Sequence, residues 1–184
     1  GEYDKALDLL SSVSDYDFDL YLLLIECHLQ LDEYKLALKL TEELLEKEDN
    51  EPKDNIFSEL GFLYSEANYY KEASLYFENS LKYNPENPDV LADLAYVYEM
   101  QNDYNSAIKT INRQLDIEPY NYEAWINMGK HYSLIGEYEK AVDAFDFALT
   151  INDSENDILK LKAHCLSLSG RTIEAIEIFK ELLL

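Results

Sequence analysis

The residues best suited to binding a transition metal are three histidines and two cysteines. His164 and Cys165 are adjacent, and His131 precedes them by about one period of the repeat described below, so the three side chains could approach one another. A structural zinc site needs four ligands in tetrahedral geometry, and the sequence offers no convincing fourth. We therefore predict no metal site and interpret the histidines as ordinary surface or core residues.

Paired carboxylates are the second candidate for chemistry. Asp89 and Asp93 are four positions apart and Glu59 and Glu66 are seven apart, so each pair shares one face of a helix. Catalysis by two carboxyl groups, as in glycosidases, requires them to face each other across a bound sugar in a closed pocket. No Ser/His/Asp set is recognisable, and Cys165 has no orienting Asn or Asp at a catalytic spacing. We predict no catalytic residues and no enzyme activity.

The charge of the chain limits its partners. The formal net charge is -23, with 15 Lys and Arg against 38 Asp and Glu. Nucleic-acid binding requires neutralisation of phosphates by basic side chains, and an anionic membrane surface would repel this chain for the same reason. The charge therefore predicts no nucleic-acid or membrane partner and favours a cationic protein or peptide. The alternative is that the acidic surface serves only solubility.

Cysteine usage and hydropathy bear on the compartment. Cys27 and Cys165 would lie many helices apart in a stacked array, beyond the reach of a disulfide. Two unpaired thiols are typical of a reducing compartment. The longest apolar run, residues 20–25, has six residues, and the opening GEYDKAL does not resemble a signal peptide. We expect a cytoplasmic, acidic protein.

The elements that would position these residues repeat along the chain. A small residue recurs at intervals of 31, 36, 34, 34 and 34, as Ala6, Ala37, Ala73, Ala107, Ala141 and Ala175. Residues 122–153 show the unit most clearly, as two amphipathic helices joined by a turn at residues 135–137. Each helix has one apolar side, and the two sides combine large residues with the small Gly129 and Ala141. One helix pair cannot close its own core, so the pairs must stack on one another.

The motif within the period resembles the tetratricopeptide repeat (TPR) family. Its Trp, Leu, Gly, Tyr, Ala and Phe places are occupied by Trp125, Met128, Gly129, Tyr132, Ala141 and Phe145. The resemblance covers essentially the whole chain and implies an all-α, right-handed α-α superhelix, a TPR solenoid of five full repeats after a leading half repeat. The predicted bounds are 1–17 for the second helix of a truncated repeat, then 18–53, 54–87, 88–121, 122–155 and a truncated 156–184.

Two details of the repeats carry further expectations. The first full repeat is the least faithful, because Ile25 stands at the place of the small residue, His28 at that of the tyrosine and Thr41 at that of the aromatic one, so we expect looser or shifted packing there. All glycines have structural roles: Gly61 and Gly129 at close helix contacts, and Gly1, Gly136 and Gly170 in turns. None remains for a phosphate-binding loop, so we predict no cofactor.

The resemblance also implies where a ligand would bind. In TPR proteins the first helices line the concave face, and the residues there that do not enter the core meet the partner. By register, the predicted peptide-binding groove consists of Asn55, Glu59, Phe62, Glu66, Asp89, Asp93, Tyr96, Glu99, Asn127, Lys130, Lys160 and His164. The two-carboxylate clamp of the chaperone-binding TPR domains is absent, and Asn127, Lys130 and Lys160 are an incomplete echo of it. The acidic part of the groove suits an extended Lys- or Arg-rich segment.

We therefore expect a non-catalytic protein-interaction scaffold. Two alternatives stay open. The apolar, apparently truncated ends, such as residues 182–184, or the convex face could form a homo-oligomer, which would make the chain a self-assembly module. The array could also be the regulatory arm of a larger enzyme or sensor, because both termini look cut.

Overall fold

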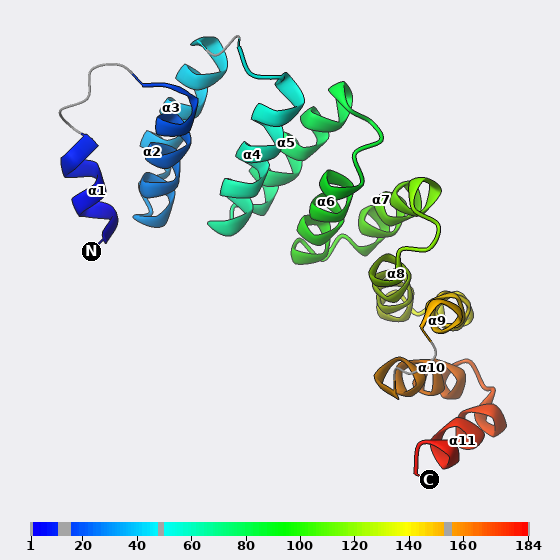
Figure 1. Cartoon of the computed structure of the whole chain (residues 1–184). Coiled ribbons are helices and arrows are strands. Elements are labelled where there is room, and N and C mark those ends of the chain that lie inside the picture. The colour runs from blue at the N-terminus through cyan, green and yellow to red at the C-terminus, as the bar shows by residue number, and fades with distance from the viewer. Residues whose placement is uncertain (1, 11–15, 48–49, 153–155, 184) are drawn as a thin grey trace. The chain divides into compact units, whose positions relative to one another are not determined.

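The chain folds as an array of α-helices (Figure 1). The computed structural model describes residues 2–10, 16–47, 50–152 and 156–183. These residues form eleven helices and no strand: α1 Glu2–Leu10, α2 Phe18–Gln30, α3 Tyr34–Lys47, α4 Lys53–Glu66, α5 Tyr70–Tyr83, α6 Pro88–Met100, α7 Tyr104–Ile117, α8 Tyr122–Leu134, α9 Tyr138–Ile151, α10 Asn156–Leu168 and α11 Thr172–Glu181. The predicted all-α solenoid of helix pairs is confirmed.

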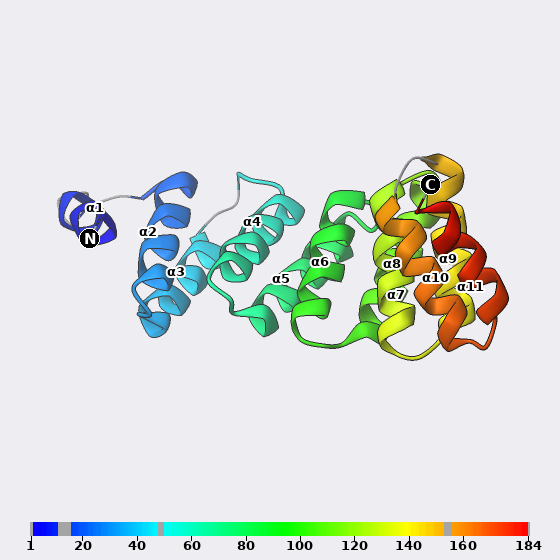
Figure 2. The same ribbon diagram turned by 90° about the horizontal axis from the view of Figure 1, so that it is seen from below.

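Helices that follow one another in the sequence pack together. The pairs α2–α3, α4–α5, α8–α9 and α10–α11 are in contact, and Figure 2 shows the members of each pair lying side by side. The chain divides into two compact units, Gly1–Val97 and Tyr98–Leu184, whose boundary falls within α6. In the second unit α9 also packs against α10, and α7 against α8, so each pair supplies the surface that its neighbour needs.

The turn inside each pair places one residue in the left-handed backbone region. These residues recur at one position per repeat: Asp32, Asn68, Asn102, Gly136 and Gly170, with φ between 58° and 90°. Asp, Asn and Gly are the residue types that adopt this conformation most readily. The next amide donates back to the last turn of the helix, as Glu137 N does to Tyr132 O at 2.9 Å. Gly136 and Gly170 were predicted to lie in turns, whereas the same role of the equivalent Asp and Asn residues was not predicted.

Side chains cap the starts of some of the first helices. The Asp17 carboxylate accepts from Leu20 N at 3.0 Å, and the Asn121 amide oxygen accepts from Ala124 N at 3.0 Å. Such caps satisfy amides that have no partner within the helix. They fix where the first helices α2 and α8 begin, and therefore which side chains each helix presents.

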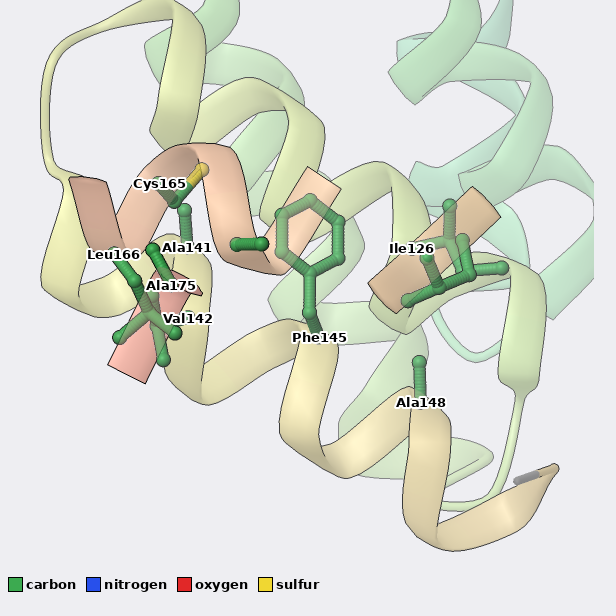
Figure 3. Close-up of a cluster of buried hydrophobic side chains, with 10 residues drawn as sticks. Ile126, Ala141, Val142, Phe145, Ala148, Cys165, Leu166 and Ala175 are labelled. Atoms are coloured by element: carbon green, nitrogen blue, oxygen red, sulfur yellow. The ribbon is translucent and has the colours of Figure 1, made fainter. Parts of the chain in front are cut away.

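Gly129 packs closely against the ring of Phe145. A Cβ atom on Gly129 would lie 2.5 Å from Phe145 Cε1, and one on Gly61 would lie 2.6 Å from Phe77 Cδ1. Figure 3 shows the Phe145 ring among Ile126, Ala141, Ala148 and their neighbours in the buried cluster of α8 to α11. The predicted role of both glycines as close-packing points is confirmed.

The packing of the first full repeat is not loose at two of its unusual residues. Ile25 and Thr41 are both fully buried. At the places that Gly129 and Phe145 occupy in the fourth repeat, the larger Ile25 is matched by the smaller Thr41. The Thr41 hydroxyl lies 3.0 Å from Tyr64 Oη and donates to Ala37 O at 2.9 Å. Both residues therefore lie in the core, and the Thr41 hydroxyl is hydrogen-bonded there.

The bounds of the repeats stay a prediction. Parts of the predicted repeats lie outside the described residues. These parts are the turn expected at Gly1, residues 11–15 of the leading half repeat, residues 48–49 near the end of the first full repeat, and residues 153–155 at the predicted end of the fourth repeat. Leu184, at the apolar end considered for self-assembly, also lies outside the described residues.

Candidate functional site

The predicted groove residues all lie on first helices. Four are on α4, four on α6, two on α8 and two on α10, in the order Asn55, Glu59, Phe62, Glu66; Asp89, Asp93, Tyr96, Glu99; Asn127, Lys130; Lys160, His164. Asn55, Glu99 and Asn127 are half-buried, and the others are exposed. Those from Asn55 to Tyr96 belong to the first unit, and those from Glu99 to His164 belong to the second.

Four of them meet at one hollow in the first unit. It has a volume of about 410 Å³ and lies between α4 and α6. We call it the acidic hollow, and its lining is Ser58, Glu59, Phe62, Asn87, Asp89, Val90 and Asp93. Helix geometry explains the set, since Ser58, Glu59 and Phe62 fall within about one turn of α4. Asp89, Val90 and Asp93 do the same on α6.

Three lining residues were missed by the sequence analysis. Ser58 and Val90 flank predicted positions, and Asn87 precedes α6. The Asn87 side-chain oxygen accepts from Asp89 N at 3.1 Å and from Val90 N at 3.3 Å. The sequence signal for Asn87 is its place immediately before Pro88, because Asn favours the cap position and Pro the first helical turn.

The acidic hollow combines negative charge with one aromatic side chain. Glu59, Asp89 and Asp93 supply carboxylates, and no Lys or Arg is among the described residues that line it. Although the Asp93 residue as a whole is exposed, desolvation of its carboxyl group raises its pKa, and the neighbouring charge of Asp89 raises it further. The Phe62 side chain is 50% exposed. A cation bound here would relieve the repulsion between Asp89 and Asp93.

The other predicted residues of the first unit do not line the acidic hollow. The Asn55 amide donates to Glu51 Oε2 at 3.4 Å. Tyr96 shares a hydrogen bond with Tyr70, whose pKa is raised first by desolvation and then by Tyr96. Glu66 is the last residue of α4, and its negative charge also raises the pKa of Tyr70.

The predicted basic residues of the second unit differ in how they are engaged. Lys160 Nζ lies 2.8 Å from Asp157 Oδ1, and this hydrogen bond lowers the pKa of Asp157. Lys130 and His164 are exposed on α8 and α10. Glu99 Oε2 lies 3.6 Å from Nε2 of the buried His131. The positive charge of Lys160 is therefore already balanced locally.

The histidines and cysteines that were considered for metal binding or catalysis lie in environments that do not favour either role. Among the described residues, no three His, Cys, Asp or Glu side chains gather in a way that could hold a metal ion. His28 Nδ1 lies 2.6 Å from Glu33 Oε2. Cys27 and Cys165 are buried free thiols, and burial raises the pKa of Cys27, which disfavours the reactive thiolate.

No helix within the described part of the chain is long and apolar enough to cross a membrane.

Comparison with known proteins shows several solved structures with the same fold. No curated protein matches it by sequence. Among solved structures, "Crystal structure of MamA protein" matches with a TM-score of 0.72 and 17% identity over 90% of this chain and 89% of that one. "MamA AMB-1 P212121" has a TM-score of 0.70 and 22% identity over 88% and 87%.

A third solved structure, "Crystal structure of YrrB: a TPR protein with an unusual peptide-binding site", has a TM-score of 0.69 and 18% identity over 100% of this chain and 91% of that one. At these identities the structures show the fold alone. The sequence profile described as tetratricopeptide repeat matches residues 1–53 and 65–125, and a second profile with the same description matches 122–155. The chain belongs to the tetratricopeptide repeat family.

Proposed function

We propose that this chain is a non-catalytic protein-interaction scaffold that binds an extended cationic segment of a partner protein through the acidic hollow between α4 and α6. Protein interaction as such follows from the family and its fold. The cationic partner and the residues that contact it are our proposal. One fold neighbour, YrrB, is described as having a peptide-binding site, which supports a peptide as the form of ligand.

The observation that carries the proposal is the convergence of Glu59, Asp89 and Asp93 around the exposed ring of Phe62. A Lys or Arg side chain has an apolar stem and a charged head. The stem would pack on Phe62 while the head pairs with the carboxylates. The raised pKa of Asp93 indicates that its charge is poorly compensated in the free protein, so a bound cation would gain from this site.

The net charge supports the same partner over a longer range. A charge of -23 attracts a basic segment and raises the rate of encounter at low ionic strength. Local contacts in the acidic hollow would then select among basic segments. Affinity should therefore fall with added salt, and should also depend on Phe62, which carries no charge.

The test measures fluorescence anisotropy of a dye-labelled peptide of alternating Lys and Leu with the whole chain. Glu59→Lys with Asp93→Lys should weaken binding at least tenfold. The matched control is Glu46→Lys with Glu78→Lys, on the second helices α3 and α5. Each substitution replaces -1 by +1, so both double variants have a net charge of -19 instead of -23. The control should change affinity by less than about threefold.

Equal losses in the two double variants would contradict the proposal, because they would reduce the attraction to an effect of total charge. Phe62→Asn gives a second criterion. It leaves the charge unchanged and should weaken binding about tenfold, which corresponds to losing the burial of one apolar side chain. An unchanged affinity would show that Phe62 does not contact the peptide.

Self-association is the second candidate function, and α11 is the element that favours it. Three large apolar residues are exposed on this helix: Ile173, Ile176 and Phe179. In the second and fourth repeats the position of Phe179 is occupied by Phe77 and Phe145, and both are buried. Sedimentation velocity at two concentrations a hundredfold apart separates this function from a monomeric scaffold. A single species of monomer mass at both concentrations would exclude it.

A further inference from the structure

A second hollow surface lies within the second unit, on the side of α8 that faces away from Asn127 and Lys130. Its larger part has a volume of about 560 Å³ and is lined by Pro119, Tyr120, Trp125, Phe147, Thr150 and Ile151. Trp125 and Phe147 also line a hollow of about 190 Å³ that reaches Asn112 on α7 and Asp143 on α9. The two hollows adjoin each other at Trp125 and Phe147, between α8 and α9, and we call them together the outer groove.

The outer groove is separate from the face predicted to form the peptide-binding groove. Successive residues of a helix are rotated by about 100°. Asn127 and Lys130 are therefore about 160° and 140° away from Trp125 around α8. Met128 and Tyr132, which line the outer groove, are within about 60° of Trp125 on the same side. A ligand in the outer groove would not contact the side chains of the predicted face of α8.

The repeat does not require two of the aromatic side chains of this groove, Phe147 and Tyr120. Phe147 is 55% exposed, and the same position of the other repeats carries Glu43, Asn79, Arg113 and Glu181. Tyr120 is 84% exposed, and its counterpart one repeat earlier is Glu86. Because the other repeats carry polar residues at these positions, folding does not require exposed aromatic rings there. Exposed aromatic clusters of this kind mark sites of protein contact.

Contacts within the chain hold two aromatic rings of the groove in place. The Trp125 and Phe147 rings are stacked, with centroids 4.5 Å apart and planes at 15°. Trp125 Nε1 donates to Pro119 O at 2.8 Å, which fixes the indole against the turn before α8. A surface whose aromatic rings are already ordered loses little side-chain entropy on binding.

The charge around the groove selects the partner. Glu118 adjoins Tyr120 in a hollow of about 260 Å³, and Asp143 lies toward the opposite end of the groove. Among the described residues that line these hollows, the one Lys or Arg is Lys140. Its Nζ lies 3.3 Å from Glu137 Oε2 and 5.6 Å from the centre of the Tyr132 ring, so its charge is already engaged. The groove therefore presents an apolar floor between carboxylates.

We propose that the outer groove binds a segment of a partner protein that inserts one large apolar side chain, aromatic or leucine-sized, against Trp125 and Phe147, with Lys or Arg beside it. A second copy of this chain fits less well, because each copy carries a charge of -23. The site is independent of the acidic hollow. A scaffold with both sites would hold two segments at once.

Trp125 is the only tryptophan of the sequence, so its fluorescence reports on this groove. The probes are three tryptophan-free peptides: Lys-Lys-Phe-Lys-Lys, the same peptide with Ser in place of Phe, and the same with Glu in place of each Lys. The first should shift the Trp125 emission in a saturable manner. The Ser and Glu peptides should bind at least tenfold more weakly.

Two variants locate the binding. Phe147→Asn installs the residue that α5 carries at the equivalent Asn79, so the helix should tolerate it, and circular dichroism checks the fold. This variant should weaken the Phe peptide at least fivefold, as measured by isothermal titration calorimetry. Phe62→Asn in the acidic hollow is the matched control and should leave the Trp125 response unchanged.

The outcomes separate the two proposed sites. Equal binding of the Phe and Ser peptides, or an unchanged affinity in folded Phe147→Asn, would overturn the outer groove as a binding site. Loss of the Lys–Leu peptide in Phe62→Asn with an intact Trp125 response supports both sites. Loss of the Trp125 response in Phe62→Asn would overturn their independence.

Discussion

Substitution of Gly129 tests the packing of the repeat most directly. A Cβ atom at this position would lie 2.5, 2.7 and 2.8 Å from three ring carbons of Phe145. Carbon atoms in contact normally stay about 3.5–4.0 Å apart, so one of the two helices must shift on the order of 1 Å. Alanine is otherwise favoured over glycine inside a helix by about 0.5–1 kcal/mol. Overpacking costs about 1–3 kcal/mol, so Gly129→Ala should destabilise by about 1–2 kcal/mol.

The first full repeat supplies the compensating change. Copying Ile25 and Thr41 gives Gly129→Ile and Phe145→Thr. Gly129→Ile alone should overpack the contact, and Phe145→Thr alone should leave a cavity that costs about 3–5 kcal/mol. Together the two substitutions enlarge the side chain on α8 and shorten the one on α9 at the same contact. The double variant should therefore be more stable than the sum of the single effects predicts, by at least about 1 kcal/mol.

The assay is urea unfolding followed by the fluorescence of Trp125, which lies in the same helix as Gly129. Far-UV circular dichroism measured in parallel shows whether the rest of the array unfolds in the same transition, since repeat proteins can unfold in parts. Additive effects of the two substitutions would refute the argument, because they would show that positions 129 and 145 do not share a contact. A stability gain in Gly129→Ala would refute it as well.

Two further predictions concern buried polar groups. Burial lowers the pKa of His131 below 6.5, against the raising effect of Glu99, so the unfolded chain binds more protons just below pH 6.5. Stability should therefore fall as the pH decreases from 6.5 through the lower pKa of the folded state, and His131→Phe should remove that component, measured as the difference in urea midpoint between pH 7.5 and 5.5. A pH dependence identical to that of the parent chain would contradict this. Thr41→Val should lower stability by about 1 kcal/mol in thermal unfolding, because Tyr64 loses its partner at 3.0 Å. Thr110→Val, whose hydroxyl bonds to Ser106 O of its own helix, is the control and should have little effect.

Much of the architecture could be predicted because it follows local and periodic rules. The recurring small residue gives the period, and helix geometry converts the spacing of Trp125, Met128 and Tyr132 into one side of a helix. The contact between Gly129 and Phe145 was also foreseeable as a small residue at a close helix approach. The burial of Ile25 and Thr41 could not be predicted in this way, because each residue departs from the repeat pattern at its position.

The candidate sites were less accessible to sequence reasoning. The register assigned Glu59, Phe62, Asp89 and Asp93 to one face, and they do line one hollow. The same register placed Tyr96 and Glu66 on that face, where they interact with Tyr70 instead of lining the hollow. The outer groove was missed although its signal was present. Comparison of Phe147 with Asn79 and Arg113 shows an aromatic side chain where the repeat is otherwise polar.

The sequence by itself determined the helices, their pairing, the residues that must be buried and the strong negative charge. These properties depend on residue type and spacing within about one repeat, which a linear pattern records. The tertiary structure decided which side chains from different helices meet. The packing of helices and turns places Glu59 and Asp93 around one hollow, Thr41 against Tyr64, and Trp125 against Phe147. Hollows, desolvated carboxylates and stacked rings depend on such packing, so they exist only in the folded chain.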